Sequence, residues 1–172
     1  MPASRLAESF PHHPLAIGLL SVILGFASGV HAQVSPDRAV GVGDPFPAWE
    51  LTDQFDETHQ LPGEATKVVV FSRSKQADES LSPVLESVAG KRLVSGEVLY
   101  LSDISRMPGL ISRLFALPAL RDRDYRVVLI REEGVADSLE TRSDCLALYR
   151  LEQGTVVARE DLCNPEDVGG AF

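Results

Sequence analysis

After residue 42 the sequence alternates between short apolar runs and longer segments with helical spacing. Three of the runs are rich in valine and leucine, and they span residues 67–71, 97–101 and 126–130. Short apolar runs of this kind are typical of strands that are buried on both faces of a sheet. We therefore expect three buried strands, the first of which ends abruptly in the polar turn at residues 72–75.

The segment between the first two runs carries the signals of a helix. Asp78 and the pair Ser82-Pro83 are typical of a helix start, and Gly90 is typical of a stop. These signals predict a helix over residues 78–89, so that the first two buried strands are joined by a helical crossover.

A second helix is predicted before the third run, over residues 108–120, with a break at Pro118. Its apolar residues recur at helical spacing and make it amphipathic. They are Leu110, Ile111, Leu114, Phe115 and Leu117. Further along, residues 145–159 predict a hairpin that turns at Gln153-Gly154, and Asn164-Pro165 can cap a final helical turn.

An extended segment and a hairpin precede the first buried strand. The prolines of residues 42–54 force an extended entry. Trp49 and Leu51 then point to one side of a strand and Glu50 to the other. The polar turn at residues 53–60 predicts the return strand of a hairpin.

This entry segment resembles the N-terminal signature of the peroxiredoxin-like and TlpA-like branch of the thioredoxin superfamily. Members of that branch begin with Val-Gly-Asp-x-x-Pro, continue into a Leu-Thr-Asp-Gln strand, and lead to a buried strand that ends at the catalytic cysteine. The matching residues are Gly43, Asp44, Pro47, Leu51, Asp53 and Gln54. The resemblance covers residues 42–168. It implies an α/β, thioredoxin-like three-layer fold in which helices flank a central mixed β-sheet.

The chain departs from the family pattern where activity would be expected. Residues 72–75 contain no thiol, and a serine hydroxyl has too high a pKa to replace a thiolate. The family's cis-proline would fall at residues 124–126, which contain no proline, and the closing helix is short and disrupted by Gly169-Gly170. Arg126 lies roughly where the family carries an arginine that assists peroxide binding, and without the cysteine we expect it to be a surface or ion-paired residue. We therefore assign no catalytic residue at the usual site.

The N-terminal segment has the features of a secretory signal. Arg5 precedes an apolar run at residues 15–30, and small side chains at Val30 and Ala32 suit cleavage after Ala32. The run is too short for a comfortable membrane span, although an uncleaved anchor is the alternative. The chain is thus divided into a signal peptide (1–32), a flexible leader (33–41) and one domain (42–172), in a protein that is periplasmic or secreted.

Charge and histidine content exclude several classes of function. Sixteen basic and 25 acidic residues give a net charge of −9, which disfavours nucleic acid and anionic membrane surfaces as partners. Three of the four histidines lie in the predicted signal. The fourth, His59, is interpreted as a solvated surface residue. Because only His59, Cys145 and Cys163 could offer soft ligands, a conventional zinc site is excluded and no metal is assigned. No glycine-rich phosphate loop precedes a helix, so no cofactor is predicted.

The two cysteines, Cys145 and Cys163, are close in the predicted hairpin. Folding about Gln153-Gly154 brings position 145 opposite roughly position 162, within reach of a disulfide. A structural disulfide in an oxidising compartment is the favoured interpretation. A reversible redox pair and two free thiols are the alternatives.

The polar turn remains the candidate binding site. Ser72, Arg73, Ser74 and Lys75 combine hydroxyls, cations and the N–H groups of a helix start, which suit a small anion or a partner carboxylate. A solvated loop is the plainer alternative. The loop at residues 103–108 should lie beside the turn, at the carboxyl ends of the strands.

The favoured hypothesis is an exported thioredoxin-like domain that is a non-catalytic binding or accessory module for an envelope protein or a small anionic ligand. The competing hypothesis is an enzyme, a thiol-disulfide oxidoreductase that uses Cys145 and Cys163. A purely structural domain of an envelope complex is a third possibility.

Overall fold

A computed structural model describes residues 38–172 of the chain. The predicted signal peptide and residues 33–37 of the predicted leader lie outside the described residues. The elements are β1 (Trp49–Asp53), β2 (Thr58–Leu61), β3 (Val68–Ser72), α1 (Lys75–Val94), β4 (Val98–Asp103), α2 (Gly109–Ile111), the π-helical turn η1 (Ser112–Ala116), α3 (Leu117–Arg121), β5 (Val127–Ile130), β6 (Leu146–Glu152), β7 (Thr155–Leu162) and α4 (Pro165–Gly170).

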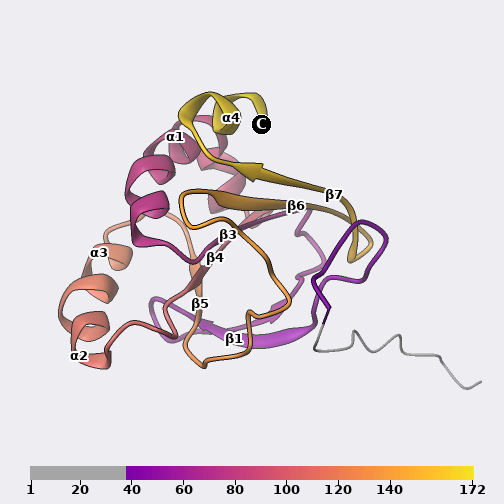
Figure 1. Ribbon diagram of the computed structural model, residues 1–172. Coiled ribbons are helices and arrows are strands. Elements are labelled where there is room, and N and C mark those ends of the chain that lie inside the picture. The colour runs from indigo at the N-terminus through magenta and orange to yellow at the C-terminus, as the bar shows by residue number, and fades with distance from the viewer. Residues whose placement is uncertain (1–37) are drawn as a thin grey trace, which may run out of the picture. The chain divides into compact units, whose positions relative to one another are not determined.

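The seven strands form one mixed sheet in the order β2-β1-β5-β4-β3-β6-β7 (Figure 1). β3, β4 and β5 are parallel and are joined by helical crossovers, whereas β1 and β6 run antiparallel to their neighbours. Both predicted hairpins are present, as β1-β2 and β6-β7. The predicted α/β fold with a central mixed sheet is therefore confirmed.

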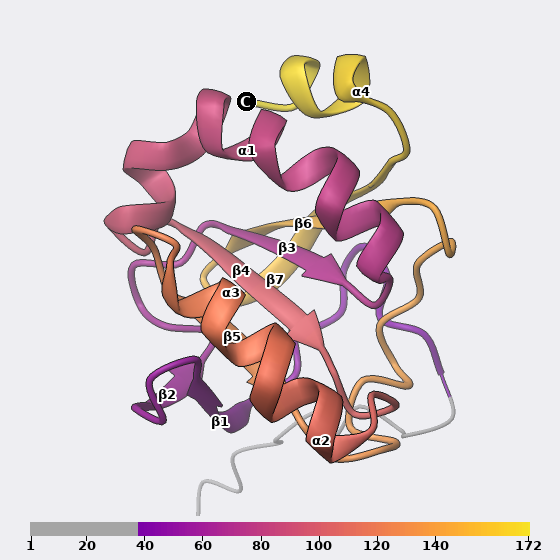
Figure 2. The ribbon, with the colours of Figure 1, turned by 90° about the vertical axis from the view of Figure 1, so that its left-hand side faces the viewer.

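The two faces of the sheet are covered differently. Val68 and Val70 pack with buried residues of α1, α3 and α4, and Figure 2 shows α1 and the α2–α3 segment in front of the strands. Val69 and Phe71 point to the opposite face, as alternation along a strand requires. That face is covered by residues from the loops at 40–46 and 131–144, including Phe46. One layer is thus helical and the other consists of extended loop segments.

Helix α1 is longer than predicted at both ends. It begins after Ser74, whose hydroxyl accepts the N–H of Ala77, so the cap lies four residues before the expected start. Pro83 lies inside the helix, where the Ser82 hydroxyl donates to the carbonyl of Asp78. Gly90 does not end the helix either, because the flanking Ala89 and Leu93 are buried against the sheet and hold the last turns in place.

The predicted amphipathic helix at 108–120 forms as the continuous run α2–η1–α3, but its apolar residues are not buried. Leu110, Leu114 and Phe115 are 69, 57 and 65% exposed. The run contacts the core through its far end, where Leu120 is buried and its carbonyl accepts a hydrogen bond from the Gln54 side chain. Helical spacing predicted the helix correctly, but it did not indicate which face is covered.

A buried polar network ties α1 to the loop before β5. Asp78 accepts hydrogen bonds from the Tyr100 hydroxyl and from Arg123, the latter at 2.9 Å. The Tyr125 hydroxyl donates to Glu86 at 2.9 Å. Burial, and then the charge of Asp78, raise the pKa of Tyr100 well above its ordinary value, so this hydroxyl stays a donor. Asp78 therefore serves as a half-buried acceptor in the first turns of the helix rather than as a cap.

The C-terminal helix also differs from expectation. Asn164 accepts the N–H of Asp167, and the Asp167 carboxylate accepts the N–H of Asn164, which completes a capping box. The helix then continues through Gly169 and Gly170 instead of being disrupted there. Burial of Val168 against the sheet compensates for the poor helix propensity of glycine.

At the other end, Val40 is buried and its N–H donates to the carbonyl of Ser138 at 2.8 Å. Part of the segment expected as a leader thus packs on the loop layer.

We predict that core and exposed leucines of the two helical segments differ sharply in their contribution to stability. Leu85→Ala removes a fully buried side chain and should lower the free energy of unfolding by about 2–5 kcal/mol. Leu114→Ala should change it by no more than about 0.5 kcal/mol. Urea unfolding followed by circular dichroism measures both, and an equal loss in the two variants would contradict the exposed placement of Leu114.

Candidate functional site

Most polar groups of the turn predicted as a binding site are buried or hydrogen-bonded to other groups of the protein. Ser72 is buried, and Ser74 is the N-cap of α1. Arg73 donates through Nε to Asp103 at 3.0 Å and through Nη2 to the carbonyl of Ala136 at 2.7 Å. Lys75 is exposed and lies 3.4 Å from Glu79. The predicted proximity of this turn to the loop after β4 is therefore confirmed, whereas its binding of an anion remains a prediction.

The predicted disulfide is present between Cys145 and Cys163, whose Cα atoms are 4.1 Å apart. Leu146 pairs with Leu162 in the β6–β7 ladder, so the two cysteines face each other directly beyond the last pair. The sequence estimate of the register was off by one residue. Both cysteines are in the bond, and the chain contains no others.

The position of the bond in the sheet was not anticipated from the sequence. In the β3–β6 ladder Phe71 pairs with Ala147. Continuing this antiparallel register by two residues places Cys145 opposite Arg73. The disulfide therefore lies at the carboxyl end of β3, beside the turn where the resemblance described in the sequence would place a catalytic cysteine. The sequence alone could have indicated this position only if the pairing of β3 with β6 had been inferred together with the hairpin.

The disulfide continues a row of side chains on the loop-covered face of the sheet. Tyr149 pairs with Arg159 and Ala147 pairs with Asp161, and the two cysteines are the next pair. Tyr149 and Ala147 belong to the core of that face. The Arg159 guanidinium lies over the Tyr149 ring at 5.9 Å and pairs with Asp161 at 3.0 Å.

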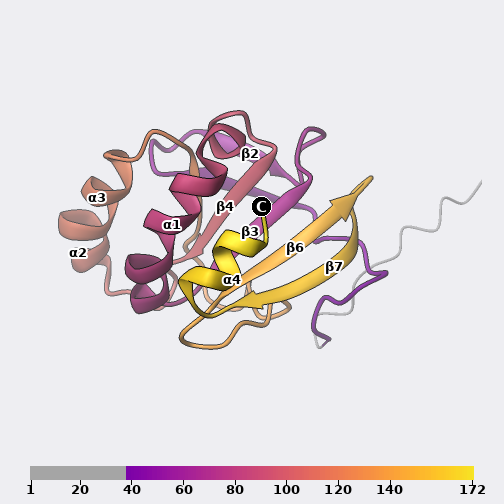
Figure 3. The same cartoon turned by 90° about the horizontal axis from the view of Figure 1, so that it is seen from above.

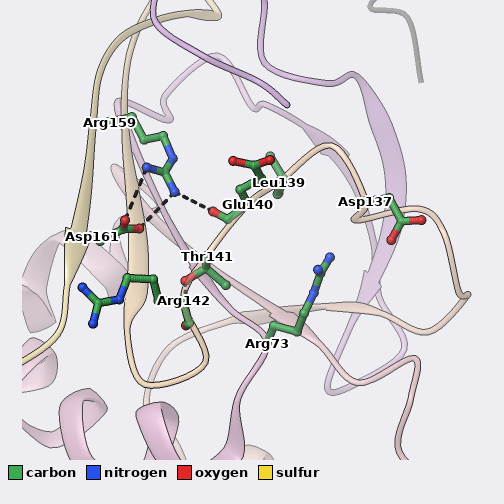
Figure 4. Close-up of a pocket in the computed structure, with 8 residues that line it drawn as sticks. All are labelled: Arg73, Asp137, Leu139, Glu140, Thr141, Arg142, Arg159 and Asp161. Carbon is green, nitrogen blue, oxygen red and sulfur yellow. Dashed lines mark hydrogen bonds and ion pairs between the residues drawn. The ribbon is translucent and has the colours of Figure 1, made fainter. Parts of the chain in front are cut away.

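A polar cavity of about 360 Å³ lies along this row (Figure 4). Its lining residues are Arg73, Asp137, Leu139, Glu140, Thr141, Arg142, Arg159 and Asp161. Figure 4 shows Arg159 and Asp161 on one side of it and Arg73 and Asp137 on the other. The loop that forms its wall leads directly to the disulfide. The N–H of Cys145 donates to the carbonyl of Arg142, and the Thr141 hydroxyl donates to the carbonyl of Cys145, both at 3.2 Å.

The two sulfur atoms differ in their surroundings. Cys145 is fully buried, whereas Cys163 is partly exposed just before α4. The Asp144 carboxylate lies 3.3 Å from the Cys145 sulfur. A disulfide sulfur has no proton to donate, but a thiol formed by reduction could donate one to this carboxylate. The arrangement therefore pairs a partly exposed cysteine with a buried one whose sulfur has an acceptor beside it.

A second polar cluster lies on the first hairpin. His59 is not a solvated surface residue, because its Nε2 lies 2.8 Å from the buried Asp53 carboxylate. Arg126 pairs with Glu57 at 3.1 Å, as expected of an ion-paired residue, and approaches Asp53 at 3.8 Å. His59, Asp53 and Glu57 offer ligand atoms within 4.8 Å of one another, and these are the residues that could hold a metal.

No family model and no curated protein matches the sequence. Solved structures do match the fold. A thio-disulfide isomerase from Thermus thermophilus is 22% identical with a TM-score of 0.53, and the match covers 77% of this chain and 94% of that one. The thioredoxin domain of a thiol-disulfide oxidoreductase from Bacteroides vulgatus is 15% identical with a TM-score of 0.52, over 77% and 96% of the chains. StoA from Bacillus subtilis is 12% identical with a TM-score of 0.50, over 74% and 97%.

These similarities establish a class rather than a family. The chain has a thioredoxin-like α/β fold, and it carries one disulfide at the start of β6.

We predict that the Asp53 carboxylate stabilises the fold in a pH-dependent way. Burial alone would raise its pKa, but hydrogen bonds from His59 and from the N–H groups of Phe55 and Glu57 outweigh this effect and lower the pKa below 3.8. Asp53→Asn should therefore lower the free energy of unfolding by about 1–3 kcal/mol near pH ~7.

Because the folded pKa is depressed, this stabilisation is complete above 3.8 and is lost as the pH falls through the folded value. Urea titrations of wild type and variant across the acid range measure the difference. A gap between the two that stays constant below 3.8 would contradict the assignment.

Proposed function

We propose that this protein carries out thiol–disulfide exchange through Cys145 and Cys163. The observation that carries the proposal is the position of the bond, at the carboxyl end of β3 and next in the row to a polar cavity. Ligands of open α/β sheets bind outside the carboxyl ends of the strands. A disulfide that only closed the hairpin would not need to lie at that edge.

The difference in exposure between Cys163 and Cys145 determines which sulfur is attacked first in the exchange reaction. A substrate thiolate attacks the partly exposed Cys163 sulfur, the bond to Cys145 breaks, and a mixed disulfide forms. The Cys145 sulfur leaves with the electron pair and takes up a proton, and the thiol then donates to Asp144. A second substrate thiolate attacks the substrate sulfur of the mixed disulfide and releases Cys163 as a thiolate. The substrate loses two electrons and two protons, and the protein disulfide gains them.

The context of the chain supports this chemistry. Two of the structures with a similar fold bear the names of thiol-disulfide enzymes. A secretory signal would place the protein in the periplasm or outside the cell, where disulfides persist. Within residues 38–172, no helix is both long and apolar enough to cross a membrane. The reaction uses protein sulfur alone and needs no cofactor.

We predict that the folded protein exchanges its disulfide with a reduced dithiol peptide. Cys145→Ser, in which Cys163 is a free thiol, should instead form a mixed disulfide on Cys163 when it is mixed with the oxidised, disulfide-bonded form of the peptide. Cys163→Ser should react at least about tenfold more slowly, because the remaining sulfur is buried. Alkylation followed by mass spectrometry counts the free thiols, and Ser72→Ala serves as a control that should exchange like the wild type.

Loss of the bond removes about 3 kcal/mol of stability in the chain-entropy model, so each variant is first checked for a folded spectrum. A wild-type disulfide that resists reduction until the protein unfolds would show that the bond is purely structural.

A non-catalytic binding module is the second candidate, and one observation favours it. Four large apolar side chains, Leu110, Ile111, Leu114 and Phe115, are exposed on consecutive turns of α2 and η1. Residues 104–121 contain three arginines and no carboxylate, in a chain of net charge −9. An exposed apolar patch with a basic surround suits an envelope protein whose contact surface is apolar with acidic side chains at its edge.

We predict that a synthetic amphipathic helix with leucines on one face and flanking glutamates binds this patch. The same peptide with lysines in place of the glutamates should bind several-fold more weakly. Leu114→Gln with Phe115→Gln should abolish binding of both peptides, and Arg113→Gln should reduce the difference between them. Fluorescence anisotropy measures the affinities, and equal affinity for the two peptides would reject an acidic partner.

A further inference from the structure

We propose that the polar cavity binds the charged ends of a short cysteine-containing peptide and directs its thiol to Cys163. This inference rests on the proposed exchange reaction and names the class of its substrate. The cavity is lined by three arginines and three carboxylates, so it suits a ligand with both charges, one that carries a free amine and a carboxylate.

The spacing along β7 sets the length of the ligand. Asp161 lines the cavity, and Cys163 is two residues further on the same face of the strand. Two residues of a strand span about 7 Å. A thiol that reaches Cys163 while its charged groups stay in the cavity must bridge roughly that distance. A short peptide meets this requirement better than a single amino acid does.

The charged side chains of the cavity are not all engaged with one another. Arg73 and Arg159 are held by internal hydrogen bonds and ion pairs, which keep them in place. Arg142 is exposed, and within the described part of the chain its one ion pair is a long contact of 3.7 Å with Asp144. Asp137 and Glu140 have no ion pair among residues 38–172. A ligand carboxylate can therefore pair with Arg142, and a ligand amine with Glu140.

The reaction with a monothiol peptide is balanced in two steps. One peptide thiolate attacks Cys163, which yields the mixed disulfide and the Cys145 thiol. A second peptide thiolate attacks the peptide sulfur of that mixed disulfide, which releases Cys163 and a peptide disulfide. Two peptide thiols are oxidised and one protein disulfide is reduced.

The test compares a charged thiol with an uncharged one. Second-order rate constants for reduction of the native protein by glutathione and by 2-mercaptoethanol are measured by rapid alkylation. Their ratio is divided by the same ratio for an unstructured cystine peptide, which removes the intrinsic reactivity of each thiol. We expect a corrected preference for glutathione of about two- to five-fold for each exposed ion pair formed.

Arg142→Gln and Glu140→Gln should each lower the preference without changing the rate with 2-mercaptoethanol. Lys91→Gln and Glu152→Gln are matched controls, because Lys91 is exposed near the end of α1 and Glu152 lies at the end of β6 remote from Cys145. Both controls should retain the wild-type preference.

The outcomes separate the two proposals. A corrected ratio of one, or a preference that both cavity variants retain, overturns the cavity assignment and leaves the exchange reaction standing. A reduced, unfolded protein can also be added as the thiol substrate. If it reacts faster than glutathione and neither cavity variant changes its rate, the cavity assignment is overturned in favour of a macromolecular substrate. If neither thiol reduces the folded protein, the exchange reaction itself fails.

Discussion

The hydrogen-bond register of β6 with its two neighbours fixes where the disulfide lies in this chain. On one side Phe71 pairs with Ala147, and on the other Leu146 pairs with Leu162. These pairings together bring Cys145 to the end of β3 and opposite Cys163. A shift of one residue in either ladder would move one cysteine to the other face of the sheet, because the side-chain period of a strand is two. The position of the disulfide is thus a consequence of strand pairing.

One face of the sheet is covered by helices and the other by loop segments. This difference determines which face holds the polar cavity. Helices α1, α3 and α4 cover one face of the sheet (Figure 3). Their leucine, alanine and valine side chains are buried in the core of that face. The loop at residues 131–144 covers the other face and brings polar side chains such as Glu140 and Thr141 next to β7. Because a loop must satisfy its backbone groups at the surface, it leaves a cavity where a packed helix would leave none.

The sequence predicted the fold well and the site only in part. Apolar runs identified β3, β4 and β5, and turn residues identified both hairpins, because these signals are local. The disulfide was predictable because a hairpin fixes the pairing of its own strands. The cavity was not, because Arg73, Glu140 and Arg159 are far apart in the sequence and meet only through the pairing of β3 with β6. His59 was misjudged for a different reason: its partner Asp53 is only six residues away, across the predicted hairpin, but the hairpin signals do not show which side chains pair. The exposure of the apolar face of residues 109–116 could not be inferred from the sequence. The helical period of apolar residues shows that one face is apolar and the other polar, but not which of them is covered.

The polar groups of the turn at residues 72–75 are engaged in local contacts. The Ser74 hydroxyl is committed to capping α1, and the Arg73 guanidinium is committed to Asp103 and to the carbonyl of Ala136. A ligand at that turn would have to replace these hydrogen bonds. Hydrogen bonds of a charged group contribute more to stability than hydrogen bonds between neutral groups. The sulfur one strand away has no such commitment beyond the disulfide itself. The same edge of the sheet therefore holds a disulfide at the start of β6, where the neighbouring cavity rather than a helix end supplies the polar groups.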